Sequence, residues 1–70
     1  MKILKKAVRK IEKMYKLRNY DNLRYTSQCN MLKYYGDESE LGQKKFQQAK
    51  TLYQYSNNMI KYVNNSEYYN

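Results

Sequence analysis

No proline occurs in the 70 residues of this chain, and its two glycines, Gly36 and Gly42, lie close together near the middle. Proline and glycine are the residues that most often end helices and mark turns. The chain therefore has one strongly marked break, and the segment on each side of it can form a long helix. This feature disfavours folds built from many tight turns and predicts an all-α protein.

Side chains that can pack recur on both sides of this break at alternating steps of four and three residues. Such spacing is typical of the seam along which helices pack in a coiled coil. The seams predict two long helices that pack against each other, with a buried structural thiol at Cys29. The first seam consists of Leu4, Val8, Ile11, Tyr15, Arg18, Asn22, Tyr25, Cys29 and Leu32, and the second consists of Gly42, Phe46, Ala49, Tyr53, Ser56, Ile60 and Val63.

The second seam separates small side chains from large ones. Gly42, Ala49 and Ser56 recur every seven residues on one side, and large residues such as Phe46 and Tyr53 lie on the other. The distance between packed helices depends on the side chains at the contact. We therefore expect the first helix to approach the second closely along the small residues.

The segment Tyr35–Glu40 predicts where the two helices are joined. Gly36 can take the left-handed conformation that often follows a helix, and Asp37 with Glu40 resembles a capping box. We predict a coiled-coil-like antiparallel two-helix hairpin, formed as a single domain by residues 1–70. Its helices are expected at about 3–35 and 38–64, with the turn at 36–37 and a polar tail rich in Tyr and Asn at 65–70.

An alternative fold has three helices. The first seam becomes polar at Arg18 and Asn22, and residues 19–22 resemble a turn that ends in a helix N-cap. Leu23 and Met31 also fall out of phase with this seam. In the alternative fold, the first helix is broken near residues 19–22.

The side chains that carry most enzyme and metal chemistry are scarce. The chain has no histidine and one cysteine, which leaves neither a zinc-binding cluster nor an internal disulfide. No glycine-rich phosphate-binding or dinucleotide-binding motif occurs. We expect a protein that is not an enzyme and that has no metal, cofactor or small-molecule substrate.

The sequence also indicates a cellular setting. Residues Met1–Lys6 are charged and lack the apolar run of a signal peptide, and no segment is apolar enough to span a membrane. A cytoplasmic location is expected. With 11 Lys, 10 Tyr and 8 Asn against 2 Gly and no Pro, the gene is expected to be AT-rich, as in many phages and mobile elements, and the location would then be the host cytoplasm.

Positive charge is concentrated near the N-terminus. Residues 1–18 hold eight basic side chains and one acid, Glu12, which is a balance of +7 in a chain of net charge +8. On a helix, most of these cations form a stripe opposite the first seam. We predict that the stripe binds the phosphates of a nucleic acid, largely without regard to base sequence, and the competing interpretation is a solvated face without a partner. The candidate residues are Lys2, Lys5, Lys6, Arg9, Lys13 and Lys16.

A second candidate surface widens the apolar arc of the second helix beyond what one partner helix can cover. It consists of Leu41, Leu52, Tyr55, Met59 and Tyr62. We expect a protein interface here, buried by a second copy in a dimeric four-helix bundle or by another protein. Tyrosines off the seams could stack on bases or anchor a protein contact, and these are Tyr20, Tyr34, Tyr35, Tyr68 and Tyr69.

These features predict a small basic binding protein, an accessory factor of a phage or mobile element that binds nucleic acid or a nucleoprotein complex. An inhibitor of a host defence complex, such as an anti-CRISPR, would be one example. The alternative is a protein-only regulatory or immunity module that acts through its seam and its tyrosine-bearing flank. Membrane binding is disfavoured because the basic helix lacks Trp and Phe on its apolar face, which is expected to pack against the second helix.

Overall fold

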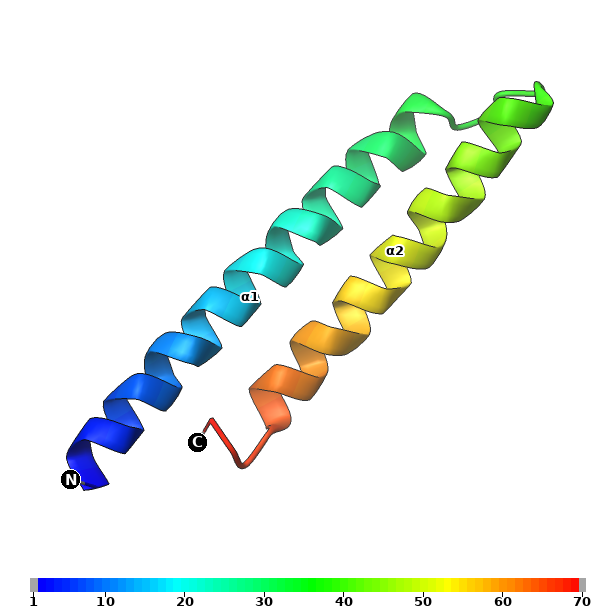
Figure 1. The fold of residues 1–70 in the computed structure, drawn as a ribbon. Coiled ribbons are helices and arrows are strands. Elements are labelled where there is room, and N and C mark those ends of the chain that lie inside the picture. The colour runs from blue at the N-terminus through cyan, green and yellow to red at the C-terminus, as the bar shows by residue number, and fades with distance from the viewer. Residues whose placement is uncertain (1, 70) are drawn as a thin grey trace.

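The structure, a computed structural model, describes the backbone of residues 2–69 and the side chains of residues 5–69. Within these residues it contains two helices, α1 (Lys2–Lys33) and α2 (Glu40–Asn65), and no strand. The helices lie side by side in opposite directions and form a rod measuring 57 × 15 × 13 Å (Figure 1). The predicted all-α helical hairpin is confirmed.

α1 continues without a break through residues 19–22, so the three-helix alternative is wrong. Asp21 does not cap a new helix. Its carboxylate instead accepts a hydrogen bond from the guanidinium of Arg24, three residues further along the same helix. Opposite charges at this spacing stabilise a helix from its surface, and this pair supports helical structure in a segment that resembles a turn.

The turn uses Gly36 as predicted but caps α2 with a different residue. Gly36 has a φ of 73°, in the left-handed region where glycine is favoured. The N-cap is Ser39, whose hydroxyl accepts a hydrogen bond from the Gly42 N–H at 3.0 Å. Asp37 Oδ1 in turn accepts hydrogen bonds from the N–H and the hydroxyl of Ser39, at 2.8 and 2.7 Å. The predicted capping box of Asp37 and Glu40 is therefore wrong.

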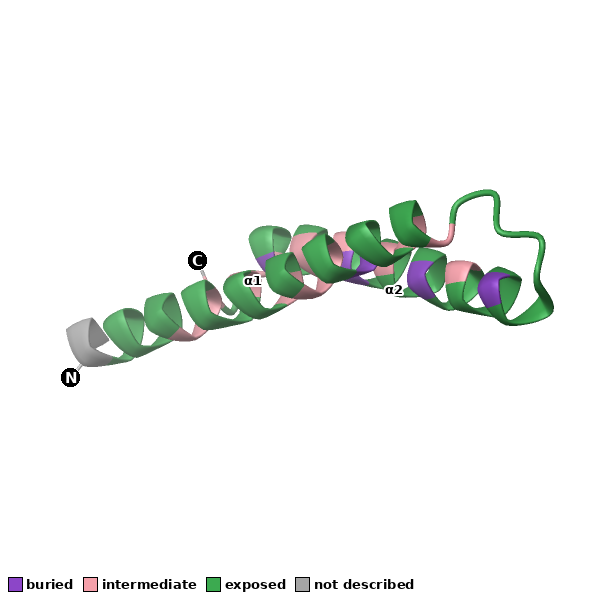
Figure 2. Cartoon of the chain, turned by 90° about the horizontal axis from the view of Figure 1, so that it is seen from above, coloured by how far each residue is buried: buried purple, intermediate pink, exposed green. Residues whose placement is uncertain are grey.

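The core is a single column of residues on the side of α2 that faces α1. It consists of Gly42, Ala49, Ser56 and Val63, which recur every seven residues and are all buried (Figure 2). Among residues 5–33 of α1, Ser27 is the one that is buried. Within residues 5–69, Ala49 and Val63 are the only hydrophobic side chains that reach full burial. The second seam is thus confirmed, and its small side chains are the ones most completely covered.

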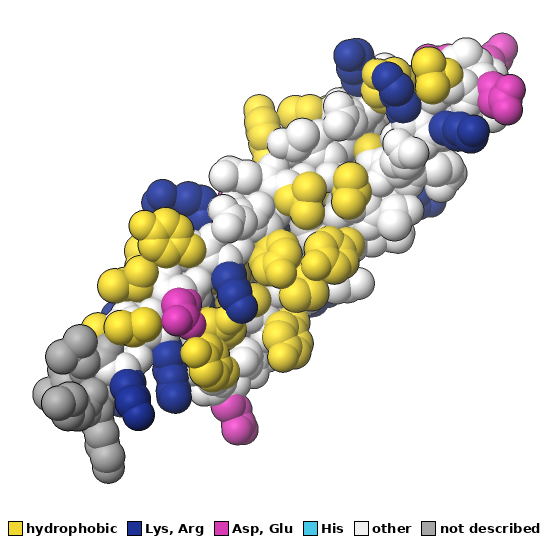
Figure 3. All heavy atoms as spheres, in the orientation of Figure 1, with side chains coloured by type: hydrophobic (Ala, Val, Ile, Leu, Met, Phe, Trp, Pro, Cys, Tyr) yellow, Lys and Arg dark blue, Asp and Glu magenta, His cyan; other side chains and the backbone are white. Residues whose placement is uncertain are grey.

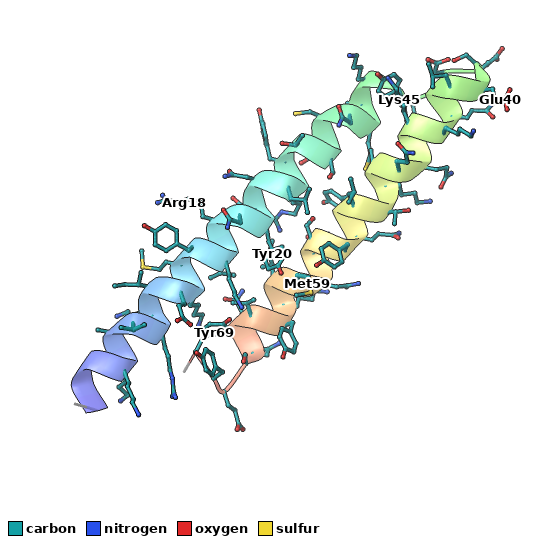
Figure 4. All side chains as sticks on the ribbon, in the orientation of Figure 1. Arg18, Tyr20, Glu40, Lys45, Met59 and Tyr69 are labelled. Carbon is teal, nitrogen blue, oxygen red and sulfur yellow. The ribbon has the colours of Figure 1, made fainter. Side chains whose placement is uncertain are left out.

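The first seam, by contrast, faces away from α2. Its described apolar residues are all exposed, and Ile11 and Leu32 have 53% and 72% of their surface accessible. Cys29 is exposed as well, so the expected buried thiol is wrong. In Figure 4, Arg18 of the same seam points outward from the hairpin. Leu4 lies outside the described side chains.

A different stripe of α1 packs against α2. These residues are half-buried or buried and also recur at steps of four and three, and they are Leu17, Tyr20, Arg24, Ser27 and Met31, with Leu23 at their edge and Tyr34 continuing the spacing just beyond the end of α1. The first seam is interrupted by Arg18 and Asn22 level with the C-terminal part of α2, where a packed helix would have to bury them. The second stripe avoids that cost because Arg24 donates a hydrogen bond to Asn57 Oδ1 at 3.2 Å.

Gly42→Ala is expected to destabilise the hairpin, although alanine has the higher helix propensity. An added Cβ would overlap the Asp37 side chain, whose own Cβ would lie at 2.7 Å. Asp37 would then no longer accept its two hydrogen bonds from Ser39, and each contributes about 1 kcal/mol to stability. This loss exceeds the gain of about 1 kcal/mol from the higher helix propensity of alanine. Thermal unfolding should show a lower Tm. In an Asp37→Gly background the same substitution should raise the Tm, and a higher Tm in both backgrounds would contradict this packing.

The Asp37 carboxylate should also make stability depend on pH. Hydrogen bonds from the hydroxyl and the backbone N–H of Ser39 hold the pKa of Asp37 below its usual 3.8. A carboxylate whose pKa is lower in the folded state than in the unfolded state stabilises the fold at pH values above its unfolded pKa. This stabilisation is lost as the pH falls through the pKa of the folded state. The Tm difference between the native chain and Asp37→Asn should be constant near neutral pH and shrink below about pH 4. A difference that persists down to about pH 2 would show that the charge is not involved.

Candidate nucleic-acid interface

The N-terminal part of α1 extends beyond the end of α2. α1 has 32 residues and α2 has 26. Arg24 lies opposite Asn57. Because the helices are antiparallel, Lys16, eight residues before Arg24, comes level with Asn65, eight residues after Asn57 and the last residue of α2. We call residues 2–16 of α1 the basic arm. In Figure 1 it projects past α2, so no second helix covers it.

The predicted cations are brought together on this arm. Lys5, Lys6, Arg9 and Lys16 are exposed and Lys13 is half-buried. The side chain of Lys2 lies outside the described residues. At about 100° per residue, the stripe formed by Lys6, Arg9, Lys13 and Lys16 continues the face of α1 that packs against α2 further along the helix. The same face of α1 therefore packs against α2 along most of its length and carries exposed positive charge beyond the end of α2.

The C-terminal tail crosses the basic arm. The Arg9 guanidinium lies over the Tyr68 ring, 4.9 Å from its centroid, and the Lys16 ammonium lies 5.2 Å from the centroid of the Tyr69 ring. The Tyr68 hydroxyl donates a hydrogen bond to Glu12 Oε2 at 3.2 Å. The two rings pack edge to face with centroids 4.8 Å apart. Cations over aromatic faces attract electrostatically, so the arm itself orders the tail (Figure 4).

These contacts keep Lys16 charged and leave one ring accessible. The side chain of Tyr69 forms a hydrogen bond with Lys16 and raises the pKa of this lysine above 10.5, so Lys16 is fully protonated at neutral pH. Tyr68 keeps 50% of its surface exposed. Beside it lies an open hollow of about 340 Å³, lined by Lys5, Val8, Arg9, Glu12 and Tyr68. Two cations, one carboxylate and an aromatic ring thus meet at one surface depression, with a net charge of +1.

The second predicted surface, which we call the α2 flank, lies on the side of the hairpin. Leu41 and Tyr62 have 64% and 65% of their surface exposed, and Leu52 and Tyr55 are also exposed. Met59 is half-buried. Tyr55 packs edge to face against Tyr20 of α1, with ring centroids 6.1 Å apart. The expected burial of this flank by a second copy or another protein stays a prediction.

Sequence reasoning did not foresee how the tyrosines would be used. Stacking of Tyr68 and Tyr69 on bases or on a protein partner stays a prediction, and in the structure both rings contact the basic arm. Tyr34 lies between Lys33 and Lys45, each 5.4 Å from its centroid, and the hydrogen bond from Lys45 lowers the pKa of its hydroxyl. No periodicity in the sequence pairs Tyr68 with Arg9 or Tyr34 with Lys45, because only the tail and the turn bring these residues together.

No family model, curated protein or solved structure matches this chain. Its function is therefore argued from its own residues. Neither helix, over the described residues, has an apolar stretch long enough to cross a membrane. No group of three or more Cys, Asp or Glu side chains within the described part of the chain is placed to hold a metal ion.

Replacing both tail tyrosines with alanine should release the tail from the basic arm. The double variant Tyr68→Ala with Tyr69→Ala loses two cation–π contacts, each worth about 0.5–1 kcal/mol at exposed sites. The ¹⁵N heteronuclear NOE of residues 66–69 should fall while that of α2 is unchanged. Tyr62→Ala, on the exposed α2 flank, is the matched control and should leave the tail ordered. A tail equally ordered in both variants would contradict its anchoring by these rings.

Proposed function

We propose that this protein binds nucleic acid through the basic arm and performs no catalysis. The observation that supports the proposal is the position of the charge. Residues 1–18 carry +7 of the net charge of +8, so the rest of the chain is nearly neutral at +1. The arm carries most of this charge, projects beyond α2 and has Lys5, Lys6, Lys10 and Lys16 exposed to solvent (Figure 3).

Phosphate binding is the chemistry that suits this arm. Lys5, Lys6, Arg9 and Lys10 are exposed within two turns of one helix, and the N-terminal end of a helix adds a partial positive charge. Over about 20 Å, such an arm can neutralise several phosphates and release their counterions. These contacts are independent of base sequence.

The tail supplies a second type of contact. The half-exposed ring of Tyr68 lies next to Arg9 and Lys5 at the surface hollow. Aromatic rings beside cations are the combination with which proteins hold single-stranded nucleic acid, because every base has a face that can stack. We therefore expect unpaired bases to be bound at least as well as duplex. A rod that occupies a nucleic-acid channel in this way could also inhibit a nucleoprotein complex, such as a defence complex directed at a phage.

Fluorescence anisotropy with labelled duplex DNA, single-stranded DNA and structured RNA tests this proposal. The native chain should bind with a salt dependence that corresponds to about three to five phosphate contacts. The variant with Lys5→Gln, Lys6→Gln and Lys10→Gln should bind roughly 10- to 100-fold more weakly at moderate salt and show a lower salt slope.

The matched control is Lys44→Gln, Lys50→Gln and Lys61→Gln, which removes the same charge from exposed positions of α2. It should bind nearly as well as the native chain. Equal weakening of both variants would mean that total charge, and not the arm, determines binding. No binding by the native chain at low salt would reject the proposal.

The second candidate function is protein binding through the α2 flank. It is favoured by the exposure of Leu41, Leu52, Tyr55 and Tyr62 along one side of the hairpin. Aromatic residues are enriched in interfaces. An interaction of this kind buries apolar surface and depends little on salt, whereas binding by the basic arm should collapse as salt rises.

A further inference from the structure

The isolated hairpin exposes more surface than a folded protein of its mass. Its accessible area is 6079 Å², whereas a monomer of 8.6 kDa is expected to expose about 4,700 Å². The excess of about 1,400 Å² exceeds the roughly 800 Å² that each partner contributes to a standard protein interface. With Ala49 and Val63 as the fully buried hydrophobic side chains of residues 5–69, the hairpin needs further burial.

The largest uncovered apolar feature is the outer stripe of α1, which is the described part of the first seam. It comprises Val8, Ile11, Tyr15, Arg18, Asn22, Tyr25, Cys29 and Leu32. The apolar side chains lie along the outer edge of α1 (Figure 3) and are all exposed. The stripe keeps coiled-coil spacing over its whole length although no helix of the hairpin packs against it. That spacing fits another long helix better than a small ligand or a flat surface.

We propose that a second copy of this chain packs against the outer stripe, with the two α1 helices antiparallel and crossing at the level of Tyr20. The stripe is symmetric about this level. Antiparallel pairing sets Val8 against Leu32, Ile11 against Cys29 and Tyr15 against Tyr25 of the second copy. Arg18 then lies opposite Asn22, and the two polar interruptions meet each other. A two-fold axis repeats every contact, which is the property that a symmetric dimer requires.

Charge selects the antiparallel arrangement over the parallel one. A parallel pair in register would place Arg18 against Arg18 and two basic arms, each part of a +7 segment, along one another. The antiparallel pair places each basic arm near the other copy's turn and the start of its α2, which carry Asp37, Glu38 and Glu40. The basic segment of each copy then lies at the acidic end of the other, which favours this orientation at long range, and like charges are kept apart.

The dimer leaves the other surfaces accessible. The outer stripe lies on the side of α1 opposite the face that contacts α2, so both hairpins keep their internal packing. The cationic stripe of the basic arm and the α2 flank stay open in both copies. A lipid surface suits the outer stripe less well, because the described stripe contains no Trp or Phe and is interrupted at its centre by Arg18.

Sedimentation equilibrium of the native chain under reducing conditions is the first test. A dimer of twice 8.6 kDa is expected. Ile11→Glu should raise the dimer dissociation constant by roughly 100-fold or more, because each dimer would bury two unpaired carboxylates. Leu52→Glu, which makes the same change on the exposed α2 flank, should leave the dimer intact, and circular dichroism should show both variants helical.

Three outcomes would overturn the proposal. The native chain could remain a monomer at high concentration. Leu52→Glu, and not Ile11→Glu, could abolish the dimer, which would move the interface to the α2 flank. A monomer that sediments with anionic vesicles, and that loses this binding in Ile11→Glu, would show the outer stripe to be a lipid-binding face.

Disulfide trapping tests the antiparallel register. Residues 11 and 29 are about 27 Å apart along one helix, so a bond between them within one copy is impossible. Mild oxidation of the Ile11→Cys variant should link the introduced thiol to Cys29 of the second copy, as peptide mapping would show. The native chain should form no Cys29–Cys29 bond, because these thiols are also about 27 Å apart in the antiparallel dimer. Efficient Cys29–Cys29 bonding, or an Ile11→Cys variant that stays unlinked, would contradict this register.

Discussion

The close approach of α2 to α1 along Gly42, Ala49, Ser56 and Val63 is the contact on which the rest of the structure depends. These side chains are small, so the two helices meet with little volume between them and bury few hydrophobic groups. The rest of the buried surface is backbone and serine hydroxyl groups. The Ser27 hydroxyl donates a hydrogen bond to the Leu23 carbonyl and the Ser56 hydroxyl to the Tyr53 carbonyl, each within its own helix. The hairpin is therefore narrow, and most of its larger apolar side chains remain near the surface (Figure 2).

The extent of this contact divides α1 into a part that packs against α2 and a basic arm that does not. Where α2 is present, the inner face of α1 carries Leu17, Tyr20 and Met31, and where α2 ends this face continues as Arg9 and Lys13. A helix partner would have to bury these cations without enough acids to pair them, which costs free energy. The C-terminal tail covers these cations without burying them. Tyr68 and Tyr69 cover part of the cationic face with aromatic rings, which interact favourably with cations while leaving them near solvent.

Arg18 and Asn22 link the fold to the proposed assembly. They interrupt the most apolar stripe of α1, and this interruption directs α2 to another face. As a result the apolar ends of the stripe stay uncovered on both sides of the interruption. A second copy in antiparallel orientation would cover both ends and place Arg18 against Asn22. Polar residues at single seam positions often specify which partner and which register a coiled coil accepts.

The sequence by itself determined the helical class, the single break near Gly36, the heptad column of α2 and the concentration of cations in residues 1–18. Each follows from local chemistry, namely backbone propensities, the period of the helix and the count of charges. The tertiary structure decided which stripe of α1 meets α2, because two stripes have the same spacing and differ in the burial cost of Arg18 and Asn22 opposite α2. Leu23 and Met31, out of phase with the first seam, were the available signal, and they belong to the contact face and its edge. The fold also decided that the tail tyrosines reach Arg9 and Lys16, since these contacts join residues far apart in the sequence whose separation in space no local pattern determines. The Ser39 cap is a local contact with Gly42, and a serine directly before Glu40 was its available signal.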